Sequence, residues 1–116
     1  MYTYRAKLVK VIDGDTIKCD IDLGFNMWKK NINVRFAGIN APETRTRDKV
    51  EKAKGLAAKA EVQRLMDESH DLILFVHELG KYGRPIADIE ILTGDLELLN
   101  VNKHLVENGF AELKEY

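Results

Sequence analysis

The chain has 116 residues, of which 45% are hydrophobic and 32% are charged. This length allows one domain, residues 1–116, with one modest core, and the composition is that of an ordinary globular protein rather than a disordered or membrane-spanning one. The net charge of −1 excludes a global positive field, so a polyanion would have to be held by positive charge gathered in a cleft.

The single cysteine, Cys19, excludes an internal disulfide and a thiolate cluster for zinc or iron. The first residues lack the continuous apolar run of a signal peptide, and no stretch reaches transmembrane length. We therefore expect a monomer that is cytoplasmic by default and does not bind membranes. If a leader has been removed, the protein would instead be secreted.

The N-terminal third of the chain predicts strands joined by turns. Asp13-Gly14 is a dipeptide typical of tight hairpin turns, and residues 24–33 predict a loop or second hairpin. Pro42 lies just beyond the last of these strands, where proline prevents further strand pairing. Apolar runs and apolar–polar alternation predict three strands, over residues 5–12, 15–22 and 32–39.

The rest of the chain mixes helices and strands. Apolar residues at helical spacing predict a helix over 48–68, although Gly55 lies inside it. Asn100 and Gly109 suit the two ends of a short helix over 101–108. Two further strands are predicted over residues 72–77 and 86–92. Five or so short strands with two or so helices predict a small α+β protein, mainly β, with the helices packed against a barrel.

Side-chain parity singles out two charged residues. Asp15 has the parity of the apolar residues of strand 15–22, and Arg35 lies in a strand that has no polar face. A charge directed at an apolar face must be paired, bound to a ligand or placed at the mouth of the barrel. A structural ion pair between Asp15 and Arg35 and a functional site both satisfy this requirement.

Three short strings fit together as parts of one phosphodiesterase site. Phosphodiester cleavage needs a hard cation held by oxygen ligands, a carboxylate that acts on water, and fixed positive charge around the phosphate. Guanidinium suits the last task because its fork of donors matches two phosphate oxygens. The strings are Ile12-Asp13-Gly14-Asp15-Thr16, Asn40-Ala41-Pro42-Glu43-Thr44 and Lys81-Tyr82-Gly83-Arg84. In isolation, each string is also typical of an ordinary turn, strand end or hairpin tip.

Because the three strings occur in this order and at this spacing, the chain resembles the staphylococcal nuclease (thermonuclease-like) family. The resemblance runs from Asp13-Gly14-Asp15-Thr16 through Arg35 and Glu43 to Arg84 and the C-terminal helix, nearly the whole chain. It implies a five-stranded OB-type barrel, one Ca²⁺ ion, and endonucleolytic cleavage of DNA and RNA that leaves 3′-phosphate ends.

The resemblance also assigns the metal site. Asp15 takes the place of the family's calcium-ligating aspartate, and the backbone carbonyl of Ala41 is a further ligand. Asp13 matches a carboxylate beside the metal that does not bind it directly. Asn40 stands where the family usually has a second aspartate, so this chain has one negative charge fewer at the metal.

The same comparison assigns the reacting groups. Glu43 matches the residue usually assigned as general base, and Arg35 and Arg84 match two arginines that stabilise the transition state. The substrate-binding residues implied are Lys81, Tyr82 and Tyr116.

Two alternatives to a metal-dependent nuclease remain open at this stage. The first is a nuclease-like barrel that binds nucleic acid without cutting it, having lost metal affinity through Asn40. The second is a plain OB-fold single-strand binder, although the predicted strands offer few aromatic residues for stacking. For the nuclease, the low net charge and short loops favour a single-stranded or flexible substrate.

Overall fold

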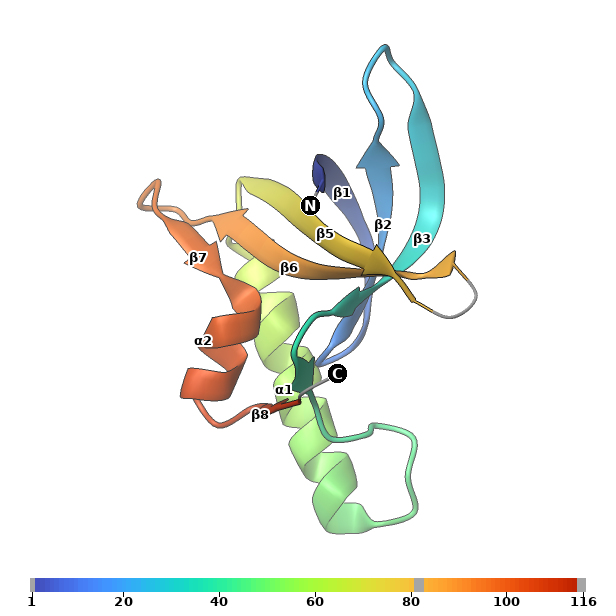
Figure 1. The fold of residues 1–116 in the computed structure, drawn as a ribbon. Helices are drawn as coiled ribbons and strands as arrows, with labels where there is room; N and C mark the ends of the chain where they lie inside the picture. Colours follow the sequence, from blue (N-terminus) through green and yellow to red (C-terminus); the bar gives the residue numbers. More distant parts are fainter. Residues whose placement is uncertain (1, 81–82, 115–116) are drawn as a thin grey trace.

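The computed structural model describes residues 2–80 and 83–114 and is mainly β, with a closed barrel of five strands (Figure 1). The barrel strands are β1 (Tyr2–Asp13), β2 (Thr16–Asp22), β3 (Trp28–Phe36), β5 (Asp71–Leu79) and β6 (Pro85–Leu92). Their order is β3-β2-β1-β5-β6, and β6 closes the barrel by pairing in parallel with β3. This confirms the expected OB-type α+β fold.

The remaining elements lie outside the five barrel strands. They are β4 (Ile39–Asn40), α1 (Lys49–Asp67), β7 (Leu98–Asn100), α2 (Val101–Glu107) and β8 (Glu112–Leu113). Strand β7 extends the sheet beside β6, and β4 pairs with β8. Both helices lie at the end of the barrel opposite the free tip of the β2–β3 hairpin (Figure 1). Among the described residues, no helix is long and apolar enough to cross a membrane.

Both helices begin and end close to the predicted positions. Asp48 caps α1 by accepting hydrogen bonds from Val50 N and Glu51 N, and Asn100 caps α2 by accepting from Lys103 N. Gly109 follows α2 with φ +78°, a conformation that favours glycine. The apolar stripe of α1 is buried against the barrel, as its spacing predicted.

Two predicted boundaries in the first hairpins are wrong. Asp13 pairs with Thr16, so the turn consists of Gly14 and Asp15 rather than Asp13 and Gly14. The third strand is displaced as well, because β3 covers Trp28–Phe36 and β4 starts only at Ile39. A turn with Gly38 at φ +72° separates the two strands. This break could not be predicted from local composition, because apolar residues lie on both sides of it.

A buried asparagine fixes this turn against the rest of the fold. Asn102 is 4% exposed, and its amide oxygen accepts a hydrogen bond from Ile89 N at 3.0 Å. Its amide nitrogen donates to Ala37 O at 2.9 Å and to Ala87 O at 3.2 Å. One side chain of α2 therefore joins β6 to the segment that follows β3.

A second polar contact joins the helices. His104 of α2 lies 2.7 Å from a carboxylate oxygen of Glu61 of α1, and Arg64 contacts the same carboxylate at 2.8 Å. The hydrogen bonds from Arg64, together with that of His104, lower the pKa of Glu61 to about 2. Glu61 therefore stays ionised over the physiological pH range and holds α2 beside α1.

Two glycines allow α1 to approach the loops at the end of the barrel. A Cβ atom on Gly55 would stand 2.5 Å from the carbonyl oxygen of Glu43, and one on Gly14 would stand 2.6 Å from the Cβ of Ala58. Real Cβ atoms do not come so close, so only glycine permits these two contacts. Helix α1 thus packs directly on the backbone that carries Asp15 and Glu43.

This packing predicts that Gly55→Ala destabilises the protein. Alanine is the better helix former by about 1 kcal/mol. Its Cβ would nevertheless push against backbone that cannot turn away, and overpacking of this kind costs about 1–3 kcal/mol. We expect urea denaturation to show a lower free energy of unfolding for Gly55→Ala and almost no change for the control Gly94→Ala, whose added Cβ would meet no atom within 4 Å. A more stable Gly55→Ala protein would contradict the close contact.

Candidate active site

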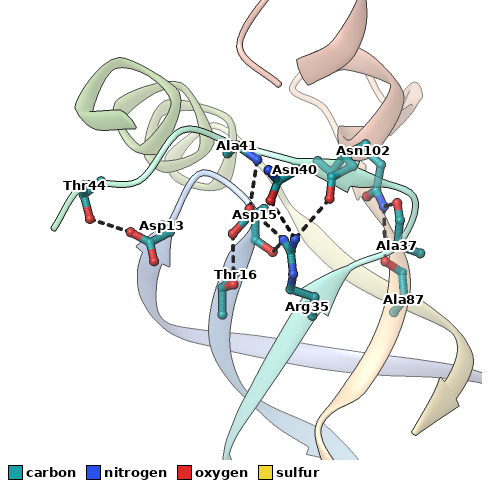
Figure 2. A network of polar contacts seen from close by, with 11 residues as sticks. Asp13, Asp15, Thr16, Arg35, Ala37, Asn40, Ala41, Thr44, Ala87 and Asn102 are labelled. Atoms are coloured by element: carbon teal, nitrogen blue, oxygen red, sulfur yellow. Dashed lines mark hydrogen bonds and ion pairs between the residues drawn. The ribbon is translucent and has the colours of Figure 1, made fainter. Parts of the chain in front are cut away.

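The site is built around the buried carboxylate of Asp15 (Figure 2). Asp15 is 8% exposed and lies in the turn between β1 and β2. Its Oδ2 atom accepts a hydrogen bond from Ala41 N at 2.9 Å and lies 2.7 Å from Arg35 Nη1. Its Oδ1 atom accepts from Thr16 Oγ1 at 3.1 Å. The buried charge is therefore fully compensated, as side-chain parity required.

Arg35 extends this network to Asn40. Its Nη2 atom donates to Asn40 Oδ1 at 3.2 Å and to Ile39 O at 3.2 Å, while Nη1 also donates to Asp15 O at 3.3 Å. The guanidinium is thus held in one orientation by groups from two segments, the β1–β2 turn and β4 (Figure 2). The structure brings together four of the residues that the sequence predicted for the site, Asp15, Arg35, Asn40 and Ala41.

Asp13 lies beside this network and is fixed from the other side. Its Oδ1 atom accepts a hydrogen bond of 2.6 Å from Thr44 Oγ1, in the loop after β4. This contact joins the first two sequence strings directly. The Asp13 side chain makes no hydrogen bond to Asp15, and its expected position beside a metal stays a prediction.

Glu43 is exposed on the loop between β4 and α1. Among the described residues, its carboxylate has no hydrogen bond or ion pair, although its backbone is fixed against Gly55. It borders an open cleft of about 610 Å³, whose other walls are the first half of α1 and the segment around Phe110. A carboxylate whose backbone is fixed and whose oxygen atoms are open to water can act as a general base.

Arg84 is exposed and immediately precedes β6. Within residues 2–80 and 83–114, its guanidinium has no hydrogen-bond or ion-pair partner. Ile86, two residues later, lies opposite Arg35 in the parallel β3–β6 pair. Arg84 therefore lies just before β6, the strand that pairs with the β3 residues around Arg35. The structure shows no direct contact between the two side chains.

Four other predicted residues have different outcomes. Lys81, Tyr82 and Tyr116 lie outside the described residues, so their substrate-binding roles stay predictions. Burial raises the pKa of the Cys19 thiol to about 12. Cys19 is therefore a protonated core residue and not a nucleophile.

The residues assigned to calcium offer the type of donor atom that calcium binds. They offer only oxygen atoms, from the Asp15 carboxylate, the Asn40 amide and the Ala41 carbonyl, and such donors suit a hard cation. Their charge is low, because Asp15 is the single carboxylate among them. In the part of the chain that the structure describes, no group of three or more His, Cys, Asp or Glu residues is arranged around a potential metal position.

Sequence reasoning gave no role to three residues that hold the site together. Thr16 and Thr44 donate hydrogen bonds to Asp15 and Asp13, and Gly55 admits the Glu43 backbone to the surface of α1. Gly55 did carry a signal, since an isolated glycine inside a helical pattern often marks a close contact. The threonines carried none, because hydroxyls next to a turn are common.

Comparisons with known proteins show the family to which the chain belongs. The chain is 29% identical over 119 residues to a micrococcal nuclease of Shigella flexneri, an alignment that covers 97% of this chain and 60% of that protein. It is also 29% identical over 129 residues to an uncharacterised protein of Methanocaldococcus jannaschii, with 95% and 59% covered. The chain thus spans about 60% of the length of these relatives. The family model described as staphylococcal nuclease homologue matches residues 33–116, and the chain belongs to this family.

Proposed function

We propose that the protein is a calcium-dependent endonuclease that hydrolyses phosphodiester bonds of DNA and RNA. The observation that carries this proposal is that the three charged groups assigned to the reaction are either open to water or held in one orientation. Glu43 and Arg84 have no side-chain partner among the described residues, whereas Arg35 is fixed between Asp15 and Asn40. A module that only binds nucleic acid has no need for an open carboxylate in addition to the two guanidinium groups.

In the proposed reaction, Glu43 removes a proton from a water molecule that attacks the phosphorus. The bond from phosphorus to the 5′ oxygen breaks, the 5′ oxygen takes up a proton from solvent and leaves as a hydroxyl, and the phosphate remains on the 3′ side. Arg35 and Arg84 donate hydrogen bonds to the phosphate oxygens, on which negative charge grows in the transition state. The hydrogen bonds to Asp15 O and Ile39 O fix the orientation of the Arg35 guanidinium, so this group needs little reorganisation when a phosphate binds. Asp15, Asn40 and the Ala41 carbonyl would hold calcium, with Asp13 beside it. Bound calcium would supply a further positive charge to the phosphate.

A nuclease assay tests the proposal. Plasmid DNA, heat-denatured DNA and single-stranded RNA are incubated with calcium, with magnesium or with chelator. We expect cutting of all three substrates with calcium and none with chelator. Denatured DNA should be cut faster than native DNA, because a net charge of −1 and short loops provide little grip on a duplex. Binding without cutting under every condition would instead establish a nuclease-like binding module.

The Arg84→Lys variant tests the second guanidinium. Lysine keeps the charge but lacks the planar fork that matches two phosphate oxygens. We expect the cleavage rate to fall a hundredfold or more, about 3 kcal/mol of barrier. The matched control is Arg5→Lys on the exposed side of β1, which should cleave like the wild type. Equal cleavage rates for Arg84→Lys and wild type would show that the Arg84 guanidinium takes no part in the reaction.

The Asn40→Asp variant tests the metal site. Affinity in oxygen-ligand sites rises with the number of carboxylates, so a second carboxylate should tighten calcium binding. We expect calorimetric titration to show about millimolar affinity for the wild type, tighter binding for Asn40→Asp, and none for Asp15→Asn. Asn26→Asp, at the distant β2–β3 turn, controls for the added charge. If Asn40→Asp binds calcium no more tightly than Asn26→Asp, the metal is not placed at Asn40.

A further inference from the structure

The β2–β3 hairpin ends in an apolar tip, residues 23–28, that projects away from the helices (Figure 1). Phe25 at its apex is 99% exposed, and Met27 is 61% exposed. Gathered exposed apolar side chains mark a place where another molecule binds. The site described above makes no use of this tip.

The tip is an ordered structure that holds Phe25 outward. Leu23 N donates to Met27 O at 2.8 Å, and Asp22 Oδ1 accepts from Gly24 N at 2.8 Å. Phe25 and Asn26 have φ values of +53° and +61°, a region that residues with a Cβ atom rarely adopt. Positive φ values at central residues belong to tight hairpin turns, and this turn leaves the Phe25 side chain in solvent.

Lysines surround the aromatic residue at the base of the tip. The Nζ atoms of Lys7 and Lys30 lie 5.0 Å and 5.7 Å from the centre of the Trp28 ring. Lys30 is also paired with Asp20 at 3.4 Å. Attraction between the ammonium groups and the ring keeps positive charge close to the tip.

Further lysines connect the tip to Arg35 along the outer face of the sheet. In the antiparallel register, Lys7 lies opposite Asp20, Lys10 opposite Lys18, and Thr16 opposite Arg35. Residues that pair directly project from the same face, and Ile17 and Cys19 on the other face of β2 are buried. Lys7, Lys10 and Lys18 therefore form a track, which we call the lysine track. It runs alongside β3 from Trp28 to Arg35, seven steps along the strand or about 23 Å.

The pair of Lys10 and Lys18 is informative in itself. Like charges directly opposite each other destabilise an antiparallel pair, so this arrangement costs the sheet stability. An anion lying across both ammonium groups would relieve the repulsion. A phosphate backbone provides such anions at regular spacing.

We propose that the lysine track and the tip bind a single-stranded nucleic acid beyond the reaction centre. Its phosphates contact Lys7, Lys10 and Lys18, and a base stacks on Phe25. This inference rests on the proposed function, because the track leads from Arg35. A flat lipid surface would meet the tip alone, whereas the lysines continue down the side of the hairpin.

Fluorescence anisotropy tests this proposal with a labelled 16-nucleotide oligodeoxythymidine in chelator, which prevents cleavage. We expect Phe25→Ala to raise Kd about tenfold, since stacking contributes that much per base, and Phe25→Trp to bind like the wild type. Lys10→Gln should lower the slope of log K against log salt by about 0.7. The controls are Leu98→Ala, exposed on β7, and Lys103→Gln, exposed on α2, and both should bind unchanged.

Equal affinity of Phe25→Ala and wild type for the oligonucleotide would overturn the proposal. So would Phe25-dependent binding to anionic phosphatidylserine vesicles by a protein that does not bind the oligonucleotide. Cleavage of a dinucleotide, which reaches only the reaction centre, separates this inference from the nuclease function. The Phe25→Ala and Lys10→Gln variants should cut it like the wild type. A wild type that binds the 16-mer with the expected variant effects but cuts neither substrate with calcium would refute the nuclease alone.

Discussion

The buried carboxylate of Asp15 is the interaction on which the arrangement of the site depends. It joins the turn between β1 and β2 to Arg35 on β3 and to the backbone of Ala41 beyond β4. These segments are separated in sequence by up to 26 residues. Taking an ion pair out of water is costly, and an apolar pair of similar size is often at least as stable. The chain therefore has little to gain in stability from charges here, whereas a phosphate-cleaving site requires them.

Helix α1 provides the rigid support for this network. Its contact with Gly14 positions the turn that carries Asp15, and the contact of Gly55 with the Glu43 backbone fixes the start of the following loop. Asn102 acts similarly from α2, because it holds the carbonyl of Ala37 just after Arg35. The side chains of Glu43 and Arg84 remain open on a fixed backbone. A rigid scaffold with exposed reactive groups is the usual arrangement of a catalytic site.

The sequence predicted the barrel, both helices and the site network more fully than it predicted local boundaries. Alternation in residues 15–22 and the cap at Asn100 are local signals, and the structure confirms them. Beside the break at Gly38, Asn102 donates to the carbonyl of Ala37 from 65 residues further along the chain, and no local pattern could reveal such a contact. The lysine track also required the structure, because Lys10 and Lys18 become neighbours only through strand register.

The central claim is that the Asp15–Arg35 pair serves the reaction and not the stability of the fold. The most direct test is the rate of single-stranded DNA cleavage by the double variant Asp15→Asn/Arg35→Met, with its urea midpoint as the check on folding. The introduced asparagine would retain an acceptor for Ala41 N, and the methionine side chain fills the space of the arginine stem. The account predicts a folded protein whose cleavage rate is lower by about a thousandfold or more. A variant that cuts DNA at the wild-type rate would contradict it.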